Sequence, residues 1–154
     1  MPIKTFRGLI AHDSIDTVVL HTQNGSTGYR IVELDIMYNT PGVGDVDHIL
    51  QVFSVPQTAA SGVVDFSDQT LLGAAFLRQD AEAANITGRM GEHVIFDNIV
   101  FNQDIYITLK NVHATGGSPS TLGCNYLIKL EQVKLDLTQN TVATLKDIRN
   151  IEQP

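Results

Sequence analysis

The strongest constraint on the fold is an alternation of apolar and polar residues that recurs along much of the chain. In "DIYITLKN" (104–111), Ile105, Ile107 and Leu109 alternate with Asp, Tyr, Thr and Lys. Successive side chains of a β-strand point to opposite faces of its sheet, so this pattern is typical of a strand with one face on a core. An amphipathic helix would instead repeat its apolar residues at intervals of three and four. The chain is therefore predicted to consist mainly of β-strands.

Seven further segments show the same period, with varying regularity. They are "IKTFRGLIA" (3–11), "TVVLHT" (17–22), "YRIVELDIMY" (29–38), "HILQVFSV" (48–55), "LLGAAFL" (71–77), "HVIFDN" (93–98) and "NYLIKLEQVKLDL" (125–137). Connections rich in Gly, Pro, Asn and Ser lie at 22–28, 39–47, 56–62 and 114–123. About eight short strands with such turns predict an all-β domain, either a sandwich or a barrel.

Two of these segments predict which side chains face the core. In 29–38, alternation places Val32, Leu34, Ile36 and Tyr38 on one face. In 125–137 the apolar residues change parity, from Ile128 and Leu130 to Val133, Leu135 and Leu137. A regular strand would turn one of these groups outward, and we therefore expect a bulge or break near Glu131–Gln132.

Helical structure is expected in two places. One turn could form around Asp80 to Ala84, in an Ala-rich stretch. At the carboxyl end, apolar residues recur at steps of three, at Val142, Leu145, Ile148 and Ile151. We therefore divide the chain into a β-sandwich domain, 1–139, and an amphipathic helical segment, 140–154. The apolar stripe of that segment could close an open end of its own sandwich or grip a neighbouring subunit.

Charge and cysteine content limit the classes of partner. The chain has 17 acidic and 10 basic residues, a net charge of −7, which argues against a surface built to neutralise the phosphates of a nucleic acid. Cys124 is the single cysteine, so no intrachain disulfide can form, and we expect it to pack as a small apolar group. No signal peptide and no run of 18 apolar residues is present, which predicts a soluble, unsecreted chain without a membrane span.

Catalytic and metal-binding patterns are not found. Five histidines are scattered through the sequence, at His12, His21, His48, His93 and His113, without the spacing of a metal site. "HDSID" brings Asp13 and Asp16 near Ser14, which is not a nucleophile with a base and an orienting group. Asp45 and Asp47 in "GDVDH" could offer oxygen atoms to calcium, but two carboxylates do not identify a site. We therefore predict no enzyme activity, no cofactor and no metal.

Sugar binding is an alternative role for a β-sandwich. Sugar rings are usually recognised by exposed aromatic faces. The chain has no Trp, and its tyrosines lie in or beside predicted strands, at Tyr29, Tyr38, Tyr106 and Tyr126.

The order of three long segments resembles a group of small virion structural proteins of tailed bacteriophages, particularly marine ones. The segments are "VDFSDQTLLGAAFLRQD" (64–80), "HVIFDNIVFNQDIYITLKNV" (93–112) and "CNYLIKLEQVKLDLTQNTVATLKDIRNI" (124–151). The likeness covers roughly 20–151, and its most telling parts are "FDN", "QDIYIT", "NYLIKLE" and "ATLKDIRNI". None of these is a catalytic signature, so the resemblance lies in their order.

The resemblance implies a jelly-roll subunit that acts as a capsid cement or decoration protein on the outside of the head. It would be assembled in the host cytoplasm, bind the major capsid protein and form a homotrimer. Candidate interface residues on that hypothesis are Lys4 and Arg7, in a segment that is either an ordering arm or the first strand, together with Val142, Leu145, Ile148 and Ile151. A tail or connector component and a carbohydrate-binding module are the alternative functions.

Overall fold

The structure of the protein, a computed structural model, describes residues 2–22, 25–40, 46–79, 90–96, 99–112, 121–136 and 145. This part of the chain is all-β, as predicted. Its eight strands are β1 (Ile3–Ile10), β2 (Ser14–Val18), β3 (Thr27–Tyr38), β4 (Val46–Phe53), β5 (Leu71–Gln79), β6 (Met90–Ile95), β7 (Ile105–Val112) and β8 (Cys124–Lys134). The helical turn expected at Asp80 to Ala84 lies outside the described residues. Within 140–154 only Leu145 is described, and its backbone is helical.

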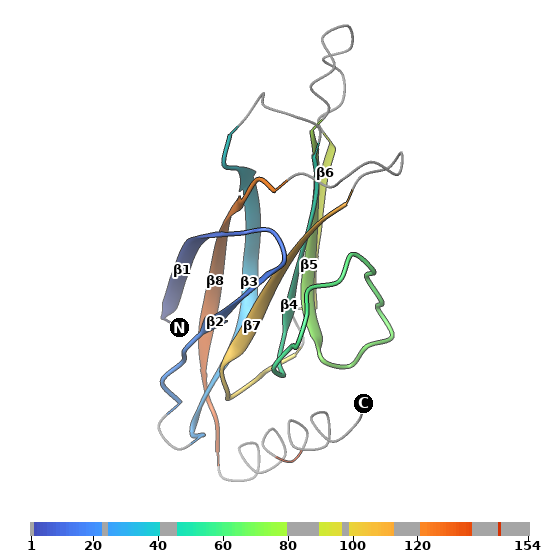
Figure 1. Cartoon of the computed structure of the whole chain (residues 1–154). Helices are drawn as coiled ribbons and strands as arrows, with labels where there is room; N and C mark the ends of the chain where they lie inside the picture. Colours follow the sequence, from blue (N-terminus) through green and yellow to red (C-terminus); the bar gives the residue numbers. More distant parts are fainter. Residues whose placement is uncertain are drawn as a thin grey trace, which may run out of the picture.

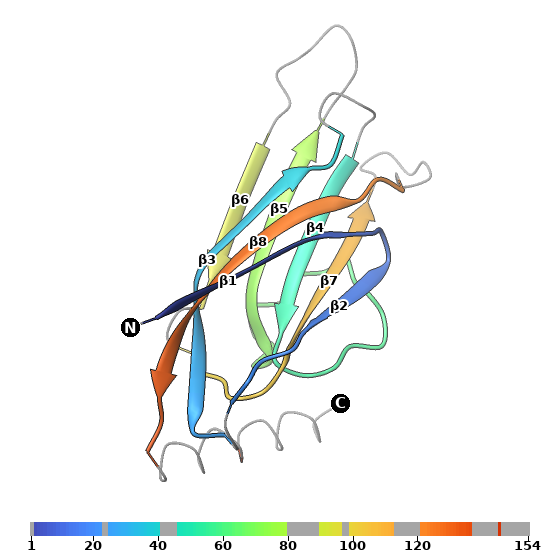
Figure 2. The same ribbon diagram turned by 90° about the vertical axis from the view of Figure 1, so that its left-hand side faces the viewer.

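The strands form two antiparallel sheets that face each other (Figure 1). The small sheet has the order β1-β8-β3 and the large sheet the order β2-β7-β4-β5-β6. Figure 2 looks onto the small sheet, with the large sheet behind it. An eight-stranded jelly roll pairs its strands in the orders 1-8-3-6 and 2-7-4-5. The order here is therefore that of a jelly roll except that β6 pairs with β5 instead of β3.

The core lies between the two sheets and consists of the side chains on their inner faces. Ile105, Ile107 and Leu109 of β7 are fully buried there, which confirms the core face predicted for this strand, although Thr108 on the opposite face is buried as well. Leu34 and Ile128 meet them from the small sheet. Apolar burial of this kind is the main favourable term in folding, about 25 cal/mol for each Å² removed from water.

One β-bulge sets the phase of the small sheet, and it lies in β3. The register against β8 shifts between Ile31 and Glu33, which pair with Leu130 and Lys129. The extra residue turns Val32 outward and buries Ile31, the reverse of the alternation predicted at these two positions. Leu34, Ile36 and Tyr38 face the interior, as predicted. β8 itself pairs with β1 without interruption. The prediction of a bulge in 125–137 is therefore wrong in position, because the extra residue lies in the partner strand, β3.

Candidate docking groove

The central strand of the large sheet, β4, is buried on both faces. Leu50 and Val52 point into the core, while Ile49, Gln51 and Phe53 lie on the outer face and are also buried. In an antiparallel sheet with one face in solvent, buried and exposed residues would alternate along the strand. The outer face is covered by residues 54–70, which connect β4 to β5 and lie beside the large sheet in Figure 1.

A buried amide holds this connection against the sheet. Gln51 Nε2 donates hydrogen bonds to the carbonyl oxygens of Ser61, at 3.0 Å, and Val63, at 3.1 Å. Between them lies Gly62, where a Cβ atom would come 2.8 Å from Val112 Cγ1 of β7. The backbone thus approaches the sheet more closely than a residue with a side chain would allow.

Two consecutive Asx turns shape the rest of the connection. Asp65 Oδ1 accepts hydrogen bonds from the backbone N–H of Ser67, at 2.9 Å, and from its hydroxyl, at 2.6 Å. Asp68 Oδ1 is bonded in the same way by Thr70, at 2.8 and 2.7 Å. The bonds from Ser67 lower the pKa of the Asp65 carboxyl. These carboxylates satisfy the backbone N–H groups of the connection locally, so that the chain can turn at the surface with Phe66 exposed.

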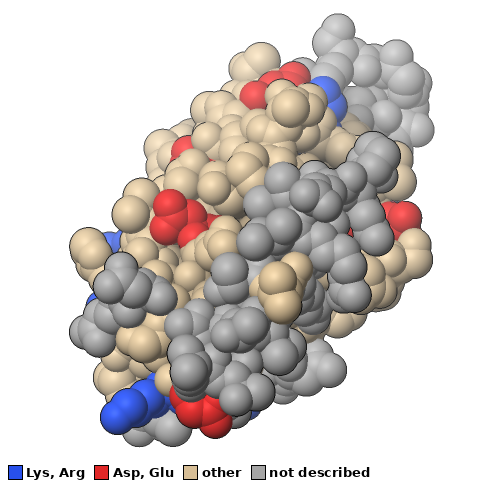
Figure 3. All heavy atoms as spheres, turned by 90° about the horizontal axis from the view of Figure 1, so that it is seen from below, with Lys and Arg blue, Asp and Glu red and all other residues tan. Residues whose placement is uncertain are grey.

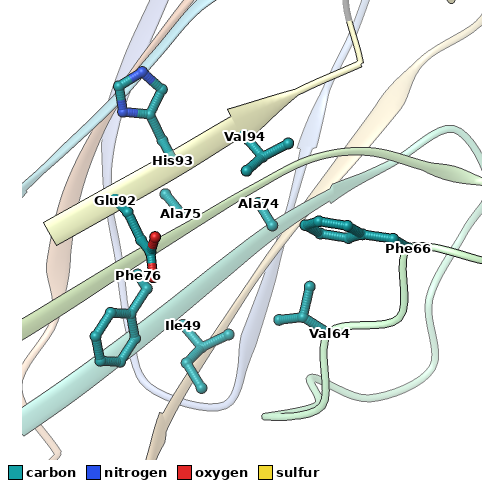
Figure 4. Close-up of a pocket in the computed structure, with 9 residues that line it drawn as sticks. All are labelled: Ile49, Val64, Phe66, Ala74, Ala75, Phe76, Glu92, His93 and Val94. Atoms are coloured by element: carbon teal, nitrogen blue, oxygen red, sulfur yellow. The ribbon is translucent and has the colours of Figure 1, made fainter.

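Phe66 and Val64 form one wall of an apolar groove on the outer face of the large sheet (Figure 4). Its volume is about 430 Å³, and Ile49, Ala74 and Val94 contribute from the strands. Phe66 is 57% exposed, and its ring meets the ring of Phe96 edge-on at a centroid distance of 5.3 Å. Val63, Val64 and Val94 are exposed as well. Clustered apolar surface of this kind marks interaction sites.

The groove has little polar chemistry. Glu92 contributes a carboxylate at one end, and His93 projects from the other side of β6 (Figure 4). No nucleophile lies beside a base among the residues that line it. Within the described ranges, no three His, Cys, Asp or Glu side chains gather as a metal site would require. The groove is therefore suited to bind an apolar surface.

Two of the five histidines take part in a buried hydrogen-bond network at one end of the sandwich. His48 Nδ1 donates to Asn111 Oδ1 at 2.7 Å, and the Asn111 amide donates to the Leu122 carbonyl at 2.8 Å. The Asn111 backbone N–H donates to His12 Nδ1 at 3.0 Å. Burial lowers the pKa of His48, against the opposing effect of the Asn111 bond. His21 and His93 are exposed, and His113 lies outside the described residues.

The acidic residues singled out in the sequence do not converge where the structure describes them. Asp13 accepts a bond from Lys110 Nζ at 2.6 Å, which lowers the pKa of its carboxyl. Asp16 faces Tyr126, whose hydroxyl donates to it at 3.3 Å. Asp47 pairs with Arg78 at 3.2 Å, and Asp45 lies outside the described residues.

The single thiol and three of the four tyrosines are buried or packed against the core, and Tyr106 of β7 is partly exposed. Cys124 is buried, as expected, and burial raises its pKa to about 12. Tyr29 and Tyr38 lie in the interior, and Tyr126 packs against the core. The exposed aromatic face of the groove is therefore a phenylalanine that the sequence analysis did not single out.

The predicted interface residues fall in two places. Lys4 and Arg7 lie in β1, opposite Leu130 and Leu127 of β8, so the first-strand alternative is the one that the structure shows. Leu145 is exposed. Val142, Ile148 and Ile151 lie outside the described residues, and the role of the stripe stays a prediction.

Charged side chains do not gather into a basic surface on the face seen in Figure 3. Lysine and arginine lie at separate points near its margin, and acidic groups are interspersed among uncharged residues. Cross-strand ion pairs take up several cations, as in Arg30–Glu131 at 2.6 Å and Lys129–Glu33 at 3.1 Å. None of the described helical residues forms a stretch long and apolar enough to span a bilayer.

Comparison with protein-family models and with curated proteins finds no match to this chain. Its class is thus defined by its fold, an all-β sandwich whose large sheet carries an apolar groove on the outer face.

Proposed function

We propose that this chain is a virion structural protein, a capsid cement or decoration protein that binds the outside of a tailed-phage head and stabilises the shell. The observation that carries the proposal is the exposed apolar groove on a two-sheet sandwich. Exposed apolar surface of this kind marks an interaction site, and a protein surface is the partner that we propose for it. The resemblance of the segment order to phage virion proteins supports the same function.

The proposed partner of the groove is the major capsid protein. Phe66 and Val64 offer apolar area at the centre of such a contact, and Glu92 offers a polar group at its edge, the usual anatomy of an interface. Association of the chain into a trimer, as in the proteins that it resembles, would place several grooves on one shell. Many modest contacts then act together, because linked sites raise the effective concentration of each other.

The first test is quantitative mass spectrometry of purified virus particles. A copy number equal to that of the major capsid protein, or a simple fraction of it, is expected. A handful of copies would indicate a tail or connector component instead. Absence from the particle would refute the virion role and leave the carbohydrate-binding module, which a sugar-dependent rise in melting temperature would reveal.

The second test measures binding to isolated shells. Phe66→Asp should abolish binding, because a carboxylate in an apolar contact costs several kcal/mol unless it is paired. Met37→Asp is the matched control, since Met37 is exposed on the small sheet, away from the groove. Equal loss in both variants, or in neither, would remove the groove from the contact.

A further inference from the structure

Four strands stand at the edges of the two sheets, and three of them are poorly suited to pair with another chain. β2 has five residues, and the described part of β6 has six. β3 carries the bulge at Val32, and Tyr29 is already bridged to Phe101. Short strands, bulges and covered edges are the devices by which proteins prevent edge-to-edge association. β1, by contrast, has eight residues in unbroken register and lies at the outer side of the small sheet (Figure 1).

The free backbone groups of β1 follow from its pairing with β8. The Gln132 N–H donates to the Pro2 carbonyl at 3.0 Å, so Pro2 and every second residue after it point their backbone groups at β8. The N–H and C=O groups of the residues between point away from β8, toward the open edge. These residues are Ile3, Thr5, Arg7 and Leu9, and their side chains are exposed on the outer face of the small sheet.

We propose that two copies of this chain pair through their β1 strands, antiparallel and across a two-fold axis at Phe6. The pair would form one continuous sheet in the order β3-β8-β1-β1-β8-β3. Ile3 of each copy then lies opposite Leu9 of the other, and Thr5 lies opposite Arg7. All four outward-facing residues on each strand are used, which gives about eight new hydrogen bonds.

Side chains favour this register over its neighbours. Ile3 is 50% exposed and Leu9 is 55% exposed, and opposite each other they form apolar cross-strand pairs on both sides of the axis. A shift by one pairing step in one direction would set Arg7 against Arg7, and like charges directly opposite are destabilising. A shift in the other direction would set Ile3 against Arg7 and so separate the two Ile3–Leu9 pairs. Arg7 thus selects a register and does not prevent pairing.

The facing layer also leaves room at this edge. A groove of about 330 Å³ runs between β1 and the residues that follow β2, lined by Lys4, Thr5 and Phe6 on one side and by Val19 and His21 on the other. Val19 is exposed there. A second copy at the edge would therefore cover apolar surface in both layers.

This pairing does not depend on the virion role. It is a two-fold contact on a surface distinct from the groove and from the C-terminal stripe, so it can exist beside a three-fold contact. A chain that makes both kinds of contact would form a hexamer in solution, or on a shell would link neighbouring trimers.

Cysteine cross-linking reads the register directly. The native thiol is buried with a raised pKa and does not compete. Phe6→Cys should give a disulfide-linked dimer on mild oxidation, because the two residues face each other across the axis in a closely spaced pair. A mixture of Thr5→Cys and Arg7→Cys should give the mixed dimer at least tenfold faster than either variant alone. The proposal would be overturned if Thr5→Cys or Arg7→Cys formed a dimer with itself faster than the two variants formed the mixed dimer. It would also be overturned if no variant formed a disulfide-linked dimer.

Sedimentation equilibrium tests whether the edge itself is used. The wild-type chain, 16.8 kDa, should have the mass of two or six chains. Thr5→Pro removes an N–H that faces the open edge and none that bonds β8, so it should reduce the mass to one or three chains while the monomer still melts cooperatively. Thr5→Val keeps the N–H and should retain the wild-type mass. A monomeric or trimeric wild-type protein, or a mass unchanged by Thr5→Pro, would overturn the proposal.

Discussion

Replacement of Gln51 by methionine should release the wall of the groove from the sheet. Methionine keeps the length of the side chain but has no donor, so the hydrogen bonds to the Ser61 and Val63 carbonyls are lost. Each such bond contributes about 1 kcal/mol net, so the free energy of unfolding should fall by about 2 kcal/mol. For a chain of this size the melting temperature should then fall by about 4–8 °C.

Two measurements check this result. Urea denaturation gives the loss of stability, and amide hydrogen exchange shows where it arises, with faster exchange at 61–64 and little change in β7. Gln57→Met is the matched control, because Gln57 Nε2 donates only to the nearby Val55 carbonyl and the residue is partly exposed. A loss below about 0.5 kcal/mol with unchanged exchange would refute the reasoning, since a typical single bond contributes that much or more.

Three further predictions concern His48, Cys124 and Gly8. The pKa of His48 in the folded state lies below its ordinary value of 6.5. Below about pH 6.5 the imidazole is therefore protonated in the unfolded state before it is protonated in the folded state. The free energy of unfolding is highest above about pH 6.5 and falls as the pH drops below it. His48→Gln should flatten that slope in urea titrations across this range, and an equal slope would contradict the assignment. Cys124, with its pKa raised to about 12, should react with a thiol reagent at pH 8 only as fast as the protein unfolds; rapid labelling of folded protein would show otherwise. Gly8→Ala should lower the melting temperature, because its Cβ would lie 2.8 Å from the Tyr126 hydroxyl, and Tyr126→Phe should recover part of the loss; no change in either variant would mean that the ring moves aside freely.

Much of the fold could be predicted because alternation is a local property of the chain. β7 shows this best, since the buried set Ile105, Ile107 and Leu109 is the one that the sequence indicates. The bulge was placed in the wrong strand, because a change of parity in one strand can be absorbed by its partner. In β3 the extra residue at Val32 does this, and only the pairing with β8 reveals it.

The groove could not be predicted from periodicity, because Phe66 and Val64 lie in a connection that belongs to no strand. Two signals were nevertheless present. "DFSDQT" contains two Asx-turn patterns in succession, Asp-x-Ser and Asp-x-Thr, which mark a defined loop. "HILQVF" has apolar residues of both parities, the composition of a strand covered on both faces. Together they indicate that the connection folds back over β4.

The position of β8 between β1 and β3 has a consequence for synthesis on the ribosome. Both neighbours of β8 are made long before it, and neither has another partner in its sheet. The small sheet therefore cannot form until β8, the last of the described strands, has been translated, and pairing across such separations is slow. In that interval the apolar inner faces of β1 and β3 are bare, and a nascent chain in this state can associate with other chains. Expression at lower temperature, or with chaperones in excess, should increase the yield of folded protein more than any change in the finished sandwich.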